Sequence, residues 1–77
     1  MTSSPYVLTV HAAVAIARRG IEGRWIEQAL SQPDKVEALQ PALLQALAHI
    51  RERGDRELRV IYHAFVNPPR VVTAYFA

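Results

Sequence analysis

The chain has 77 residues, a hydrophobic fraction of 51% and a formal net charge of +2. This length is near the lower limit for one independent hydrophobic core, and the apolar content excludes global disorder. The absence of cysteine excludes disulfides and thiolate metal sites, and there is neither a secretory signal nor an apolar run near the roughly 20 residues of a membrane helix. We therefore expect a cytoplasmic protein with a single domain over residues 6–77 and a flexible lead-in over residues 1–5.

The N-terminal part of the sequence predicts a short edge strand over residues 6–9, followed by a helix that ends at Arg19. Thr9 suits the N-cap because its hydroxyl can accept a hydrogen bond from a free backbone N–H of the first turn. Gly20 suits a left-handed C-cap, and Ile21 is the apolar residue that often follows such a cap.

The middle of the chain predicts a second helix and leaves a longer segment ambiguous. Apolar residues recur at helical spacing over residues 22–30, and the sequence Ser-Gln-Pro-Asp ends that pattern. The leucines of residues 35–48 also fit a helix. Residues 46–52, however, lead into a turn signal at 53–56 and then into a clear strand, so we predict a strand for 46–52.

The C-terminal third predicts an antiparallel hairpin whose first strand, residues 57–66, is the centre of the sheet. Both runs are rich in β-branched and aromatic residues, and an Asn-Pro-Pro break separates them from each other. Side chains alternate between the two faces of a strand. The face predicted to pack on the core holds Leu58, Val60, Tyr62, Ala64, Val66, Val72, Ala74 and Phe76. The other face, which suits a shallow binding or catalytic surface, holds Arg59, Ile61, His63, Phe65, Val71, Thr73 and Tyr75.

The register of the two strands around the 53–56 turn follows from matching their apolar faces. A turn centred on Asp55 places Ile50 opposite Val60 in the core. The same register places Arg51 opposite Arg59 on the outer face. Two like charges directly opposite each other disfavour a sheet unless an anion lies between them, so the pair is a candidate phosphate site. Neighbouring glutamates could equally relieve the repulsion.

Five short motifs occur along the chain in a characteristic order. They are Leu8-Thr-Val-His-Ala12, Arg19-Gly-Ile21, Pro33-Asp34, Leu58-Arg-Val-Ile61 and Val71-Val-Thr-Ala-Tyr-Phe76. In this order the chain resembles a small bacterial family, domain of unknown function 4258, which is similar to the RelE/ParE toxin superfamily. The resemblance implies an α+β fold in which two N-terminal helices pack on one face of a twisted antiparallel β-sheet. It also implies a ribonuclease or gyrase-inhibiting activity and an antitoxin protein as partner.

The chain departs from this family pattern at one position of the first helix. Related sequences commonly carry an arginine four residues after the motif histidine, where this chain has Ala15. Arg19 is retained. Arg18 lies about 100° from Arg19 around the helix, so we expect it to be a poor substitute. If the missing arginine binds phosphate, the departure weakens any activity.

The first functional hypothesis is a toxin-like, metal-independent ribonuclease, in which the 2′-hydroxyl of the RNA is the nucleophile. Such an enzyme needs a base, an acid and positive charge beside the phosphate. The candidate catalytic residues are His11, Arg59, His63 and Tyr75, and the candidate RNA-binding residues are Arg19, Arg51 and Thr73. The three histidines lack the spacing of metal ligands, and we expect no cofactor. Each candidate also has a structural alternative, such as helix capping for His11.

The second hypothesis is a non-catalytic interaction module of the same fold. It would bind an antitoxin-like protein, a nucleic acid or a second copy of itself. Eight of the nine basic residues are arginines, whose paired N–H donors suit RNA, DNA or an acidic protein surface. The sequence does not separate this hypothesis from the first.

Overall fold

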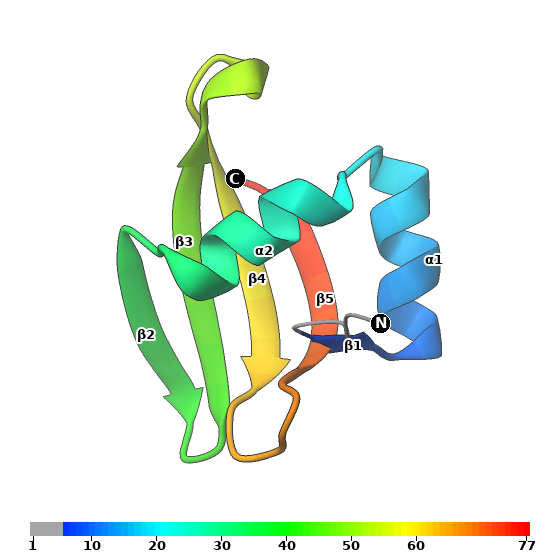
Figure 1. Ribbon diagram of the computed structural model, residues 1–77, viewed down its shortest axis with the longest axis vertical. Coiled ribbons are helices and arrows are strands. Elements are labelled where there is room, and N and C mark those ends of the chain that lie inside the picture. Colours follow the sequence, from blue (N-terminus) through cyan, green and yellow to red (C-terminus); the bar gives the residue numbers. More distant parts are fainter. Residues whose placement is uncertain (1–5) are drawn as a thin grey trace, which may run out of the picture.

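The computed structural model describes residues 6–77, so the expected lead-in over residues 1–5 lies outside the described residues. The chain forms an α+β fold (Figure 1). Its elements are β1 (Val7–Leu8), α1 (Val10–Arg19), α2 (Gly23–Ser31), β2 (Lys35–Gln40), β3 (Leu43–Ile50), the 3-10 helix η1 (Arg51–Arg53), β4 (Arg56–His63) and β5 (Arg70–Phe76). No helix of residues 6–77 is long and apolar enough to cross a membrane.

The five strands form one sheet in the order β1-β5-β4-β3-β2, with β4 at its centre as predicted. The expectation of a purely antiparallel sheet was wrong, because β1 runs parallel to β5. A parallel pair needs a long crossover connection, and here all the elements between β1 and β5 provide it. Figure 1 shows α2 crossing in front of β3 and β4, with α1 beside β5.

Local signals fix both ends of α1 as predicted. The Thr9 hydroxyl accepts a hydrogen bond from the Ala12 backbone N–H at 3.0 Å. At the other end Gly20 adopts a left-handed conformation with φ 65° and ψ 32°. The Ile21 N–H then bonds back to the Ile16 carbonyl at 3.0 Å, which satisfies a carbonyl of the last turn. The helix that carries His11 is therefore held at both ends by its own sequence.

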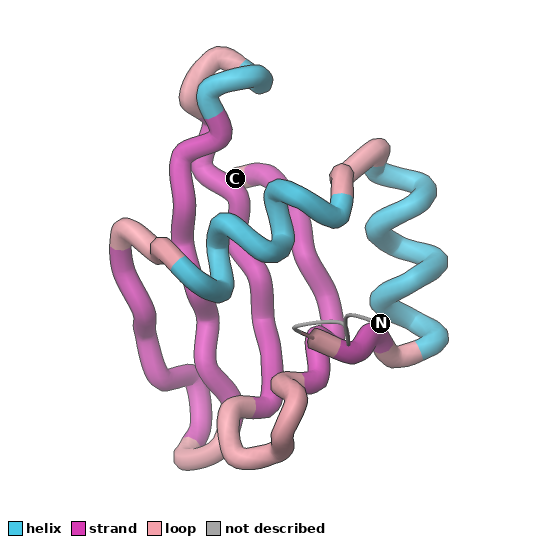
Figure 2. Tube along the Cα trace, in the orientation of Figure 1, coloured by secondary structure: helices cyan, strands magenta, loops and turns pink. Residues whose placement is uncertain are grey.

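The ambiguous segment forms the hairpin of β2 and β3 (Figure 2). The prediction of a strand over 46–52 was right in kind, but β3 spans Leu43–Ile50 and the last residues of that range belong to η1. Alternation explains why tertiary packing overrides the helical spacing of the leucines. Ala46, Ala48 and Ile50 point to one face and are fully buried there.

The predicted register between β3 and β4 was wrong. Ile50 lies opposite Arg56, where we expected Val60, which is a shift of four residues along β4 from position 60 to position 56. The cause is the position of the turn, because η1 begins at Arg51, directly after Ile50, and the turn over residues 51–55 is therefore centred on position 53 and not on 55. The shift is even, so the side chains of β3 and β4 keep their predicted faces.

The cross-strand pair expected between Arg51 and Arg59 does not form. Arg51 lies in η1, beyond the ladder of β3 and β4. Arg59 lies opposite Leu47 of β3 and Tyr75 of β5. The anion site predicted between two arginines on adjacent strands is thereby removed.

A β-bulge reverses the predicted faces at the start of β5. Ile61 pairs with Thr73, but Tyr62 pairs with Val71, so Val72 is an extra residue in the ladder. Val71, assigned to the outer face, is 0% exposed in the core, whereas Val72, assigned to the core, is only half-buried. The alternation that holds from Thr73 to Phe76 therefore assigns the wrong face to the residues that precede the bulge.

β4 also ends earlier than predicted, at His63 rather than residue 66. The residues between β4 and β5 form a loop, in which Phe65 is 79% exposed. Ala64 and Val66 therefore do not extend the core face of the sheet. The asparagine and prolines that suggested the break lie in this loop.

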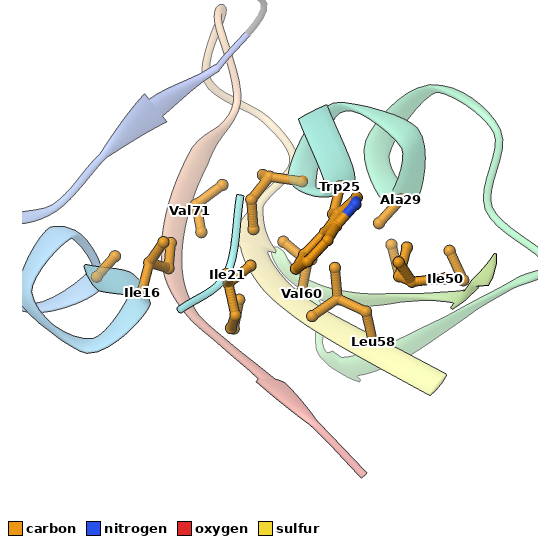
Figure 3. Close-up of a cluster of buried hydrophobic side chains, with 13 residues drawn as sticks. Ile16, Ile21, Trp25, Ala29, Ile50, Leu58, Val60 and Val71 are labelled. Carbon is orange, nitrogen blue, oxygen red and sulfur yellow. The ribbon is translucent and has the colours of Figure 1, made fainter. Parts of the chain in front are cut away.

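The core lies between the inner face of the sheet and the two helices (Figure 3). The predicted helix residues Ile16, Ile21, Trp25 and Ile26 are all buried in it. Trp25 meets Phe76 edge to face, with ring centroids 5.9 Å apart. Because Leu58 and Val60 point into this core, Arg59 and Ile61 must point to the opposite face of the sheet.

Candidate functional site

One face of α1 lines a surface pocket of about 440 Å³. Its lining residues are His11, Val14, Ala15, Arg18 and Arg19. They recur at intervals of three and four residues, which is the spacing of one helix face. A helix held at both ends thus presents one imidazole and two guanidinium groups to a single cavity.

Arg18, which we expected to be a poor substitute for the missing family arginine, lines the same pocket as His11. Arg18 follows His11 by seven residues, which is about 20° short of two full turns, so the two lie on the same side of α1. Ala15 lies between them and is buried. Its short side chain leaves room where a longer one would enter the pocket. The angle of about 100° between Arg18 and Arg19 does not reveal that Arg18 lies on the same side of the helix as His11.

Arg19 joins the pocket to the sheet. Its Nη1 donates to the Ala74 carbonyl at 3.0 Å and to the Thr73 hydroxyl at 3.4 Å. Thr73 and Arg19 were both predicted as RNA-binding residues, and the structure brings them together. The guanidinium group has further N–H donors besides this nitrogen, so holding β5 does not prevent it from binding an anion.

The pocket is electropositive. None of its five lining residues is acidic, and two of them are arginines in the last turn of α1. Part of that charge is offset by the negative end of the helix dipole. The charge of two guanidinium groups exceeds this partial charge, which is equivalent to about half an elementary charge. The cavity therefore suits an anion, and phosphate fits the forked donors of arginine.

The outer face of the sheet carries a second group of predicted site residues. Arg59 lies opposite Tyr75, and its Nε donates to the Glu57 carboxylate at 2.8 Å. This hydrogen bond, and secondarily one with Tyr75, raises the pKa of Arg59. The Tyr75 hydroxyl in turn donates to the Gln45 side-chain carbonyl at 3.5 Å. The charge of Arg59 is already paired with a carboxylate, so it is less available to a phosphate than that of Arg18.

Two predicted site residues lie apart from both groups. His63 shares a face with Arg59 but follows it by four residues, about 13 Å along the strand. It lies opposite Arg70 at the other end of β4. Arg51 is exposed in η1. Neither lines the α1 pocket. Within residues 6–77 no group of three or more His, Cys, Asp or Glu side chains could hold a metal ion.

Sequence reasoning considered Arg18 only as a poor substitute for another arginine, and it missed Gln45. The seven-residue interval from His11 could have identified Arg18, since that interval returns to the same helix face. Gln45 is a buried polar residue of β3. It could not have been placed, because its segment was compatible with both a helix and a strand.

A comparison with protein families gives a match over nearly the whole chain. The model of a domain of unknown function, DUF4258, matches residues 8–76. No curated protein and no solved structure gives a significant match. The description of the matched family assigns no activity, so a function must be argued from the α1 pocket and the outer face.

Proposed function

The chain belongs to the DUF4258 family, and we propose that it is a toxin-like ribonuclease whose reaction centre is the α1 pocket. The observation that carries the proposal is that His11, Arg18 and Arg19 line one cavity. Imidazole is the side chain best suited to proton transfer near neutral pH, and guanidinium groups stabilise a phosphoryl transition state. The RelE/ParE-like relationship implied by the sequence motifs agrees with this chemistry and is part of the same proposal.

The reaction follows from these groups. The 2′-oxygen of a ribose attacks the adjacent phosphorus, and His11 accepts the proton that leaves the 2′-hydroxyl. The bond from phosphorus to the 5′-oxygen breaks, and water protonates the leaving oxygen. The hydroxide that remains takes the proton from His11 and restores the neutral imidazole. The products are a 2′,3′-cyclic phosphate and a 5′-hydroxyl. Arg18 and Arg19 stabilise the negative charge that builds on the phosphoryl oxygens.

The outer face of the sheet binds the neighbouring nucleotides in this proposal. Thr73 is held by Arg19 at the pocket, and Tyr75 lies two residues further along the same face of β5. A half-exposed tyrosine ring can stack on a base of single-stranded RNA. Arg59, the partner of Tyr75, then orients the ring more than it contacts the scissile phosphate.

The test is cleavage of labelled single-stranded RNA by the purified protein in EDTA, with mapping of the new ends. His11→Gln keeps a polar side chain but removes the proton acceptor, and we expect a rate loss of about 10²- to 10⁴-fold. Arg18→Ala should cost on the order of 10²-fold. Arg51→Ala is the matched control, because it removes an exposed arginine outside the pocket. Its rate should stay within about twofold of the wild type.

The outcomes separate the proposal from its rivals. Cyclic phosphate ends that disappear in His11→Gln and persist in Arg51→Ala would support it. Cleavage that His11→Gln leaves unchanged would place the reaction centre elsewhere. Cleavage abolished by EDTA would contradict the metal-independent chemistry.

A second candidate function, a non-catalytic binding module, is favoured by the apolar character of the outer face. Leu47 is buried there although its side chain points away from the core, because the neighbouring strands place Arg59 and Lys35 on either side of it. Ile61 and Val72 are only half-buried. RNA that binds without being cleaved, and more weakly to Tyr75→Ala, would favour this module over the ribonuclease.

A further inference from the structure

β2 is an edge strand with one unpaired side. It is the last strand in the sheet order and pairs only with β3 among the described strands. All six of its residues, Lys35–Gln40, are exposed. Figure 2 shows it at the end of the sheet remote from α1. A strand of this kind presents a row of free backbone N–H and C=O groups that can pair with another strand.

The inner face of β2 is apolar and is left open by the helices. Val36 lies opposite Ala46 and therefore points to the core side of the sheet. α2 packs on β3 and β4, and Val36 remains 45% exposed. Leu39, at the bulge between Ala38 and Gln40, is 47% exposed. A strand added beside β2 would cover part of this apolar surface.

The charges of β2 indicate which strand can pair with its free edge. We propose that two copies of the chain associate through their β2 edges, antiparallel and related by a two-fold axis at Val36. In that register Lys35 of each copy lies opposite Glu37 of the other, and the two Val36 side chains meet on the core face. The result is one continuous sheet with both α2 helices on the same side.

The neighbouring symmetric registers are disfavoured by like charges. A two-fold axis at Glu37 places the two Glu37 side chains opposite each other, and an axis at Lys35 does the same for the lysines. Within one copy Lys35 Nζ lies 4.0 Å from a Glu37 carboxylate oxygen, and both side chains are largely exposed. Such a loose surface pair contributes little and can be exchanged for the cross-strand pair.

The expected dimer is weak. In this register only Lys35, Val36 and Glu37 of each copy lie opposite strand residues of the other. Three residue pairs bury much less than the roughly 800 Å² per partner of a standard protein interface. Dimer formation should therefore appear only toward the upper end of a protein concentration series. Opposite-charge pairs across strands favour pairing, so reversing one charge should weaken dimer formation by about tenfold or more.

Sedimentation velocity over a concentration series tests the register by charge exchange. Lys35→Glu and Glu37→Lys should each weaken the dimer, because each creates two like-charge pairs across the axis. The double variant Lys35→Glu/Glu37→Lys has the net charge of the wild type and should restore the dimer. Arg51→Glu reverses a charge in η1 and controls for net charge, and circular dichroism checks that each variant is folded.

The outcomes are decisive in either direction. Loss of the dimer in both single variants and its recovery in the double variant would support the β2 interface and its register. A wild type that stays monomeric at every concentration, or a dimer that survives both single reversals, would overturn it. The result is independent of the ribonuclease proposal, because β2 lies at the end of the sheet opposite to α1 (Figure 1), and α1 carries the residues that line the pocket.

Discussion

The β-bulge at Val72 predicts a large difference between two adjacent and chemically identical substitutions. Val71 is 0% exposed and belongs to the core cluster, whereas Val72, the extra residue of the bulge, is half-buried and lies outside that cluster. Val71→Ala should therefore lower the free energy of unfolding substantially, and Val72→Ala should lower it little. Alternation without the bulge predicts the reverse order.

The magnitude follows from the two carbons that Val71→Ala removes. Their lost burial costs about 1.6 kcal/mol at about 0.8 kcal/mol per buried carbon. A cavity of roughly 50 Å³ adds up to about 1.2 kcal/mol at about 24 cal/mol per Å³ if the surroundings do not relax. The expected loss is about 1.6–3 kcal/mol. For a domain of this size each kcal/mol lowers the Tm by about 4–8 °C.

Urea denaturation followed by far-UV circular dichroism measures both variants against the wild type. Val72→Ala should change the free energy of unfolding by about 0.5 kcal/mol or less, as for a residue outside the core. Both substitutions lower β-propensity equally, so the difference between them isolates burial. A greater loss in Val72→Ala than in Val71→Ala would refute the bulge and the face assignment of β5.

Three further predictions concern α1 and the β2–β3 edge. The pKa of Asp34 is lowered from its ordinary value of 3.8, first by a hydrogen bond from the His49 side chain and then by one from the His49 backbone N–H. The stability that ionised Asp34 contributes is therefore complete above the unfolded-state pKa and is lost as the pH falls through the lower folded-state pKa. Asp34→Asn should reduce the loss of stability at acid pH, measured by urea denaturation. Gly20→Ala should lower the free energy of unfolding by about 1–2 kcal/mol, because φ at this position is 65°. No atom lies within 4 Å of an added Cβ, so this cost comes from the backbone conformation and not from a clash. A thermal melt unchanged from the wild type would contradict this. Arg19→Ala should lower stability by about 1 kcal/mol through loss of the bonds to β5, whereas Arg18→Ala should leave it within about 0.5 kcal/mol, and equal thermal melts for the two variants would show that Arg19 does not hold the sheet.

The parts of the fold that the sequence predicts correctly are those specified by adjacent residues. Thr9 and Gly20 act on the backbone within three or four positions, so the ends of α1 could be located without tertiary information. The β3–β4 register depends on where the turn is centred, and η1 moves the centre from the expected position 55 to position 53. The parallel pairing of β1 with β5 depends on the whole intervening chain and has no local signal.

The candidate site was likewise predicted only in part. His11, Arg19 and Thr73 were identified as residue types suited to RNA chemistry, and the structure places His11 and Arg19 in one pocket with Thr73 bonded to Arg19. Arg51 was assigned to the wrong surroundings, because its predicted neighbour followed from the register. His63 lies on the expected face, but a face alone does not specify the distance to the other residues.

The hydrogen bonds from Arg19 to Thr73 and Ala74 join residues that are 54 and 55 positions apart. Closing a loop of that length costs about 3.5 kcal/mol of chain entropy in addition to a constant term. Synthesis proceeds from the N-terminus, so α1 emerges from the ribosome long before β5 exists to receive Arg19. During translation the pocket residues are carried by a helix without its strand, and the cavity acquires its supported form only after β5 has been made and has joined β4. Whatever the pocket binds, it therefore lacks the support of β5 until that strand has been made.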